Sequence, residues 1–277
     1  MRTEDIKAMI SLLDDNDSEV VDIVENNIKN LGKEAIPFLE KEWEKSNLNP
    51  VLQKRIESLV HNLSLENLSK DFFKWKESES DDLLKGLWLI AKYQYPDLKI
   101  ETLSKEINKV QLEIWIRTQE KMHPNDMVKI INEVIFEHFK YEPNIKNFHS
   151  SSNSMFNEVL TEKKGNPVAL SCLYILLAKK LDLPIFGVNL PNLFVLIFDY
   201  PGYPFYINPF NKGQIFYAKD IDDYLKQMNV DPSDKYYKAC TNVEIIKRIL
   251  TNLSFSYQKI GDEVKQNEVN TLLEIFK

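Results

Sequence analysis

Residues 166–210, NPVALSCLYILLAKKLDLPIFGVNLPNLFVLIFDYPGYPFYINPF, contain the elements that decide the fold of this 277-residue chain. The run from Pro167 to Leu181 is strongly apolar, and a proline preceded by Asn166 is a typical first helical residue together with its cap. A helix that is apolar all round is a buried helix. The sequence therefore predicts a core helix that begins at Pro167.

A β-hairpin is predicted directly after this helix. Two runs rich in β-branched and aromatic residues, Leu193 to Asp199 and Tyr203 to Ile207, flank the turn pair Pro201-Gly202. The first run is apolar on both faces, which indicates a strand covered on both sides. We expect the core helix to cover one of these sides.

Short amphipathic helices make up most of the remaining chain. Apolar residues recur at helical spacing over residues 4–13, 18–30, about 33–43 and 51–63. Further helices are predicted between residues 79 and 160, and two more follow residue 229. Four large aromatic residues of the middle region are predicted to be core residues: Trp88, Trp115, Phe136 and Phe139.

The acidic turn between the first two helices has two possible interpretations. Asp15, Asp17 and Glu19 alternate as in a calcium-binding loop, but that motif needs Gly at its sixth position and Glu at its twelfth. Val20 and Asn26 occupy those positions. We therefore predict helix capping here, and no metal or cofactor site is expected in this chain.

Composition narrows the classes of function. Acidic residues outnumber basic residues by 42 to 35, the net charge is -7, and the basic residues are scattered, which argues against a nucleic-acid partner. The longest apolar run, residues 167–178, is shorter than the roughly 20 residues needed to span a bilayer. Neither a secretory signal nor a C-x-x-C pair is present, so we expect a cytoplasmic protein without a membrane partner.

Two regions resemble known families. Residues 12–44 resemble a HEAT-type helical repeat, and residues 80–277 resemble the SirB-type family, which combines a transglutaminase-like domain with tetratricopeptide-like C-terminal helices. The most specific matching pieces are Asn153-Ser154, Asn157 to Leu160, Gly165-x-Pro167, Gly187-Val188-x-Leu190-Pro191 and Pro209-Phe210-x-x-Gly213. The resemblance implies an α+β, predominantly α-helical fold, with a transglutaminase-like core helix on a small antiparallel sheet flanked by helical repeats. It also implies three parts: residues 1–75, 76–228 and 229–277.

The catalytic triad of transglutaminase-like enzymes is replaced at every position that the resemblance assigns to it. Such enzymes place a Cys at the start of the core helix, a His on the next strand and an Asp on the one after. Those positions carry Pro167, Leu193 and Asn208 in this chain. We therefore expect a pseudoenzyme that binds a protein or peptide, with Asn166, Asn192, Leu193 and Asn208 as candidates for the binding cleft.

Two other functions stay open. The chain could be a hydrolase or acyltransferase that uses Cys172 or Cys240 with a relocated histidine, although Cys172 is expected to be a small buried hydrophobic residue. All the histidines precede the core helix: His61, His123, His138 and His149. The third hypothesis is a small-molecule binder, because a cleft that has Leu in place of His favours apolar or aromatic groups.

Overall fold

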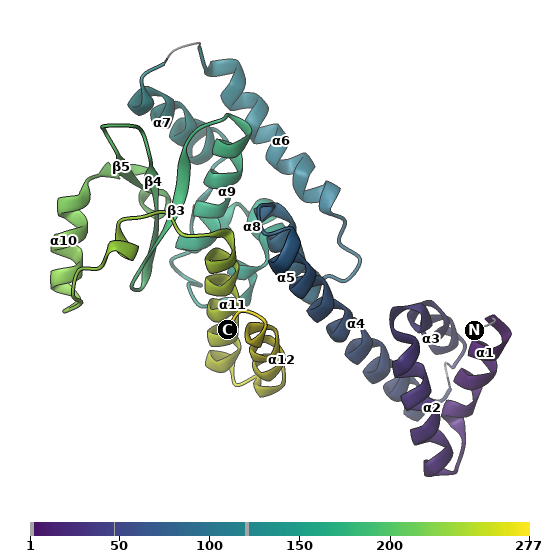
Figure 1. The fold of residues 1–277 in the computed structure, drawn as a ribbon. Helices are drawn as coiled ribbons and strands as arrows, with labels where there is room; N and C mark the ends of the chain where they lie inside the picture. Colours follow the sequence, from purple (N-terminus) through teal and green to yellow (C-terminus); the bar gives the residue numbers. More distant parts are fainter. Residues whose placement is uncertain (1–2, 47, 120–121) are drawn as a thin grey trace. The chain divides into compact units, whose positions relative to one another are not determined.

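The computed structural model describes residues 3–46, 48–119 and 122–277. The chain divides into two compact units, Met1–Asp71 and Phe72–Lys277. The fold is α+β and predominantly helical, as the sequence predicted, and both of its β-sheets lie in the second unit (Figure 1).

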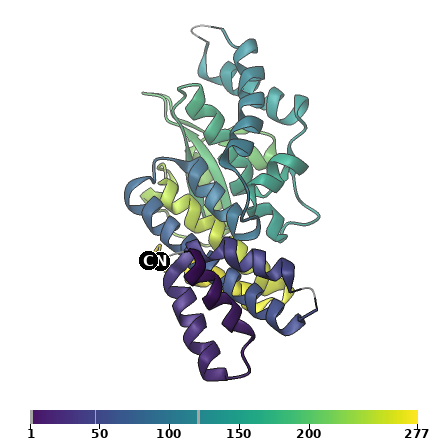
Figure 2. The same ribbon diagram turned by 90° about the vertical axis from the view of Figure 1, so that its right-hand side faces the viewer.

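The first unit is a cluster of helices, drawn in purple to dark blue in Figure 2. Its helical segments are α1 (Thr3–Ser11), η1 (Leu12–Asp14), α2 (Ser18–Leu31), η2 (Gly32–Ala35), α3 (Ile36–Lys45) and the greater part of α4 (Pro50–Ser78). Their apolar faces meet in one core that includes Leu13, Ile28 and Leu39. The helix predicted to end at residue 63 continues to Ser78, because buried Leu68, Phe72 and Trp75 extend its apolar spacing.

Side-chain capping organises the acidic turn between α1 and α2. The Asp17 carboxylate accepts a hydrogen bond from the Glu19 N–H at 2.9 Å and is the N-cap of α2. Asp15 accepts from the Asp17 N–H at 2.9 Å in the same way. The capping interpretation of this turn is therefore confirmed.

Helices form the first half of the second unit. They are α5 (Leu83–Gln94), α6 (Ile100–Arg117), α7 (Pro124–Asn132), the π-helical turn η3 (Glu133–His138), η4 (Ser151–Ser154) and α8 (Phe156–Glu162). The prediction that Trp115 is a core residue was wrong, because its side chain is 63% exposed on α6. Ile107, Val110 and Ile114 form the buried face of that helix instead.

The predicted hairpin is confirmed and belongs to a four-stranded antiparallel sheet. Its strands are β3 (Ile185–Leu190), β4 (Leu193–Phe198), β5 (Phe205–Asn208) and β6 (Gln214–Phe216), which pair in that order. Strands β4 and β5 flank Pro201-Gly202, with Leu196 opposite Ile207. The sheet is a meander, so each strand pairs with its neighbour in sequence.

Helices cover the two faces of this sheet. Helix α9 (Pro167–Lys180) packs on β3 and β4, and α10 (Ala218–Gln227) lies on the other side (Figure 1). On the α10 side, Ile221 and Leu225 pack against Val188 and Val195 of the sheet. This arrangement explains why β4 is apolar on both faces.

The chain ends in two antiparallel helices after the short turn η6 (Asp234–Tyr236). Helix α11 (Asn242–Ile260) starts with a capping box formed by Thr241 and Glu244, and Gly261 at φ 74° ends it before α12 (Glu263–Glu274). The sequence assigned these helices to a part of their own, residues 229–277. In the structure they belong to the same compact unit as α9, and α11 packs against η4, α5 and α9.

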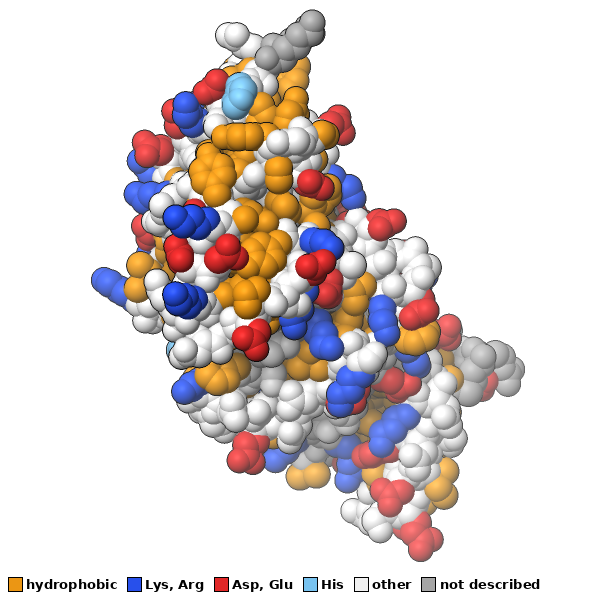
Figure 3. All heavy atoms as spheres, turned by 60° about the vertical axis from the view of Figure 1, so that its left-hand side comes forward, with side chains coloured by type: hydrophobic (Ala, Val, Ile, Leu, Met, Phe, Trp, Pro, Cys, Tyr) orange, Lys and Arg blue, Asp and Glu red, His pale blue; other side chains and the backbone are white. Residues whose placement is uncertain are grey.

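Several large apolar side chains remain exposed in the second unit. Figure 3 shows apolar side chains between charged ones on the face that lies at the left of Figure 1. The exposed side chains in and beside the sheet include Phe186, Tyr200, Tyr203 and Tyr217. Within the described parts of the chain, no helix combines the length and the apolar character needed to cross a membrane.

Candidate functional site

The start of α9 is built as the sequence predicted. Asn166 is the N-cap residue, and its Oδ1 accepts a hydrogen bond from the Ala169 N–H at 2.9 Å. Pro167 is the first helical residue, where its missing N–H costs nothing because the first turn has no intrahelical acceptor. Just before the helix, the two-residue strand β2 (Lys164–Gly165) pairs in parallel with β1 (Glu142–Pro143). These contacts fix the end of α9 at the edge of a cavity.

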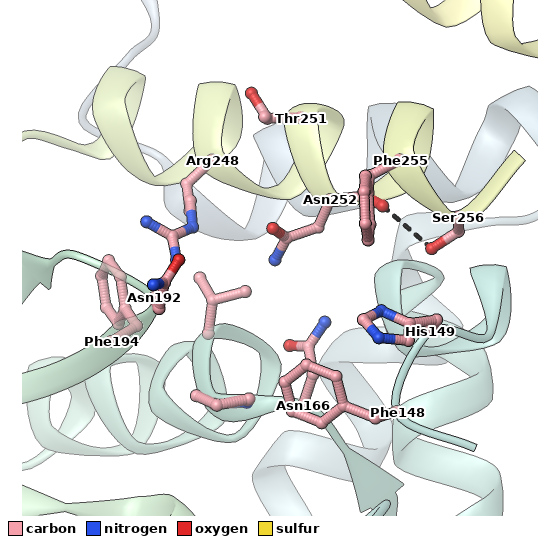
Figure 4. A pocket seen from close by; sticks show the side chains of 12 residues that line it. Phe148, His149, Asn166, Asn192, Phe194, Arg248, Thr251, Asn252, Phe255 and Ser256 are labelled. Carbon is pink, nitrogen blue, oxygen red and sulfur yellow. Dashed lines mark hydrogen bonds between the residues drawn. The ribbon is translucent and has the colours of Figure 1, made fainter. Parts of the chain in front are cut away.

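A cavity of about 610 Å³ opens at this end of α9 (Figure 4). Its walls come from the segment before η4, from the first turn of α9, from the β3–β4 turn with the start of β4, and from one face of α11. The lining residues are Phe148, His149, Asn166, Pro167, Val168, Asn192, Phe194, Arg248, Thr251, Asn252, Phe255 and Ser256.

The structure brings together three of the residues singled out in the sequence. Asn166, Pro167 and Asn192 all line the cavity. Asn192 occupies the tight turn between β3 and β4 with φ 56°, a conformation that Asn tolerates better than most residues. Its side chain therefore lies at the cavity by virtue of the turn that it forms.

The other two predicted residues lie elsewhere. Leu193, the first residue of β4, packs against the apolar cluster that includes Leu225 of α10, on the sheet face opposite α9. Successive strand residues face opposite sides, so Phe194 lines the cavity in its place. The Oδ1 of Asn208 accepts hydrogen bonds from the N–H groups of Phe210 and Asn211 at 3.1 and 3.3 Å and caps the short helix η5 (Pro209–Asn211).

Sequence reasoning missed the contribution of α11. Arg248, Thr251, Asn252, Phe255 and Ser256 lie three and four residues apart and so share one helix face, which forms a wall of the cavity. A polar stripe at this spacing, next to the buried Ile245, Ile249 and Leu253, was the available signal. The spacing alone does not show which other segment this helix face meets, because that depends on how α11 packs.

Arg248 carries the charge of the cavity. Its Nη1 donates hydrogen bonds to Asn189 Oδ1 at 2.9 Å and to the Leu190 carbonyl at 3.4 Å. Both acceptors are neutral. Burial lowers the pKa of the Arg248 guanidinium from its ordinary value, with the opposite effect of Tyr224 as the smaller contribution. The protein therefore holds a partly desolvated cation in this wall.

Aromatic rings surround the imidazole of His149 at the cavity. The ring centroids of Phe148 and Phe255 lie 5.2 and 5.3 Å from that of His149, in edge-to-face arrangements. Of the three histidines in the second unit, His149 lines the cavity, whereas His123 and His138 do not. His123 is the N-cap of α7, where its Nδ1 accepts from the Asn125 N–H, and His138 lies 3.4 Å from Arg117 Nη2 on the surface.

Both cysteines pack away from the cavity. Cys172 lies inside α9 with no exposed surface, and burial raises the pKa of its thiol. The backbone N–H of Cys240 donates to the Gly187 carbonyl at 2.8 Å, and burial raises the pKa of its thiol to about 12. Among the described residues that line the cavity, neither cysteine is found.

Slow alkylation of both cysteines is the expected consequence. With a pKa of about 12, the thiolate fraction of Cys240 at pH 7.5 is roughly 3,000-fold below that of a free thiol of pKa about 8.5. Because the native pKa is raised, the labelling rate should still be rising at about pH 10, where a free thiol of pKa about 8.5 is almost fully ionised and its rate has levelled off. Iodoacetamide labelling followed by peptide mass spectrometry measures this, with the denatured chain as the fast control. Rapid labelling near pH 6 would contradict it and indicate a thiol activated by a base.

Comparison with known proteins defines the class of this protein. A family model described as the transglutaminase-like superfamily matches residues 101–251, more than half of the chain, so the protein belongs to that superfamily. The match includes α9, the four-stranded sheet and the part of α11 that carries Arg248. Most of the cavity lining therefore lies within the matched residues, and Asn252, Phe255 and Ser256 follow directly after them on α11.

Individual relatives have little sequence identity with the chain. A UPF0162 protein of Xylella fastidiosa strain 9a5c is 26% identical over 198 residues, 65% of this chain and 66% of the relative. F-box only protein 21 of Mus musculus is 28% identical over 141 residues, 47% of this chain and 21% of the relative. The chain thus spans just under two thirds of the first relative and about a fifth of the second. No solved structure matches.

Proposed function

We propose that this chain is a non-catalytic member of the transglutaminase-like superfamily that binds a protein or peptide segment in the cavity at the start of α9. The observation that carries the proposal is Pro167, which occupies the first position of α9 and lines the cavity. A helix N-terminus favours a thiolate, so this is where a nucleophilic cysteine would be activated. A proline ring has no group that can attack an acyl carbon.

The composition of the cavity suits a peptide. Asn192 and Asn252 each offer a side-chain amide, which can donate to a peptide carbonyl and accept from a peptide N–H. Asn166, whose Oδ1 accepts from the Ala169 N–H, can donate through Nδ2. The rings of Phe148 and Phe255 provide apolar surface for a side chain of the partner. The proposal includes the SirB-type resemblance, with HEAT-like helices in the first unit and tetratricopeptide-like helices at the C-terminus.

Small-molecule binding is the second candidate. A volume of about 610 Å³ falls within the roughly 300–1,000 Å³ typical of ligand pockets. A cysteine-dependent hydrolase or acyltransferase is the third, and the burial and raised pKa of Cys172 count against it. We therefore place binding ahead of catalysis.

An acyl-transfer assay tests the non-catalytic half of the proposal. The full chain is incubated with a glutamine-containing peptide and a fluorescent amine, and in parallel with an activated ester. We expect the same rate for the wild type, for Pro167→Ala and for the double variant Cys172→Ser/Cys240→Ser, at the level of the buffer. Turnover that the double variant lacks would show that this chain is a cysteine enzyme.

Peptide selection tests the binding half. Peptides from a displayed library are selected on the full chain and their affinities measured by fluorescence polarisation. The substitution Thr251→Trp, at an exposed position of α11, places an indole at the cavity. We expect the selected peptides to lose at least about tenfold in affinity, equivalent to one well-made contact. Unchanged affinity for the variant would place peptide binding outside this cavity.

A further inference from the structure

The charge at the cavity has no acidic counterpart among the residues that the structure describes. The cavity-lining residues among the described ones include Arg248 but no Asp or Glu. Of the five guanidinium donors, the two on Nη1 meet Asn189 and the Leu190 carbonyl. No ion pair of Arg248 is found among the described parts of the chain. Because buried charges are usually paired, this guanidinium is available to an anion from outside.

A second donor faces the same space from the opposite wall. Asn166 is 5% exposed, and its Oδ1 is occupied by the Ala169 N–H. This contact orients the amide so that Nδ2 points into the cavity (Figure 4). No hydrogen bond from Nδ2 is found among the described residues. Val168 also lines the cavity, and as the second helical residue it has an N–H that no intrahelical carbonyl can accept.

The N-terminus of α9 adds positive potential to these hydrogen-bond donors. Helix α9 has 14 residues, and its N-terminus carries the positive end of the helix dipole. Arg248, Asn166 and the first turn of α9 therefore all favour a ligand that supplies acceptors and negative charge. Apolar surface lies beside them: the rings of Phe148 and Phe255, 40% and 42% exposed, both line the cavity.

We propose that this cavity binds a carboxylate carried by an apolar or aromatic group, with the carboxylate between Arg248 and Asn166 and the apolar part against Phe148 and Phe255. The inference rests on the proposed function, since it names the ligand chemistry of the same cavity. A carboxylate of this kind occurs at the C-terminus of a peptide that ends in an apolar residue, and also in a free aryl acid. The shared feature is an oxyanion next to apolar surface.

Matched acids and amides test the proposal by isothermal titration of the full chain. The probes are 3-phenylpropionate with 3-phenylpropionamide, and N-acetyl-alanyl-phenylalanine with its C-terminal amide. A charge-assisted pair of hydrogen bonds should make each acid bind about tenfold or more tightly than its amide. The pair that shows the stronger binding identifies the source of the carboxylate. Equal binding of acid and amide in both pairs would overturn the inference.

Two variants assign the effect to the named residues. In Arg248→Gln the ratio of acid affinity to amide affinity should fall to about 1. The control Arg117→Gln removes a surface arginine paired with Glu113 and should leave this ratio unchanged. Asn166→Asp keeps the cap on the Ala169 N–H, because Asp caps as well as Asn. It replaces the donor Nδ2 by a negative oxygen, so acid affinity should fall about tenfold or more while circular dichroism stays unchanged.

The remaining outcomes separate this inference from the proposed function. If inorganic phosphate binds as tightly as the aryl acid, the inference that the ligand also needs an apolar group is overturned. Cysteine-dependent turnover in the acyl-transfer assay would remove the non-catalytic proposal even if the acids bind. Absence of acid binding together with absence of turnover would leave the non-catalytic proposal standing and remove only the carboxylate site.

Discussion

Replacement of Trp75 by alanine is expected to lower the free energy of unfolding of the Phe72–Lys277 unit by about 3–5 kcal/mol, the usual cost of deleting a buried Trp or Phe side chain. The indole is fully buried, its N–H donates to the Asp82 carbonyl at 2.8 Å, and its ring centroid lies 6.4 Å from that of Phe276. It also lies against Gly86 of α5, where a Cβ atom would come within 2.7 Å of the ring. The indole thus joins the end of α4 to α5 and to the C-terminus.

Phe73, two residues earlier on the same helix, provides the matched control for Trp75. Its side chain is 58% exposed, so Phe73→Ala should change the free energy of unfolding by no more than about 0.5 kcal/mol. Urea denaturation followed by far-ultraviolet circular dichroism measures both variants without depending on tryptophan fluorescence. Similar costs for the two substitutions would contradict the burial of Trp75.

Gly213→Ala is expected to destabilise the second unit by about 2–4 kcal/mol more than Gly202→Ala does, from strain and unpaired buried polar groups. Both glycines have positive φ, 74° and 78°, so both substitutions carry a similar backbone cost. A Cβ atom on Gly213 would lie 1.9 Å from Asn132 Oδ1, whereas nothing lies within 4 Å of one on Gly202. The difference between the variants therefore isolates the contact with Asn132.

If the Asn132 side chain moves aside, two of its hydrogen bonds are lost. Its Nδ2 donates to the Gly213 carbonyl at 2.9 Å, and its Oδ1 accepts from the Tyr174 hydroxyl at 3.2 Å. Tyr174 is fully buried on α9, and burial raises the pKa of its phenol well above the ordinary value. Displacement of the amide would leave that hydroxyl unpaired in the interior. Thermal unfolding of both variants gives the comparison, and equal melting temperatures would refute the argument.

Local signals were sufficient for the elements around the cavity. Asn166 and Pro167 predicted the cap and first residue of α9, and Pro201-Gly202 predicted the β4–β5 hairpin. Each depends on a few neighbouring residues whose backbone preferences are intrinsic. The prediction for α4 was too short because its apolar spacing continues past residue 63 with no breaking residue.

The sequence by itself determined the fold class, the start of the core helix and the proline that occupies it. Only the tertiary structure decided that Phe194, and not Leu193, lines the cavity, because the β3–β4 turn sets which face of β4 meets α9. It also decided that Arg248 of α11 lies in the same cavity as Asn166. Contacts between residues so distant in sequence depend on how helices pack, and no local preference of either segment specifies that packing.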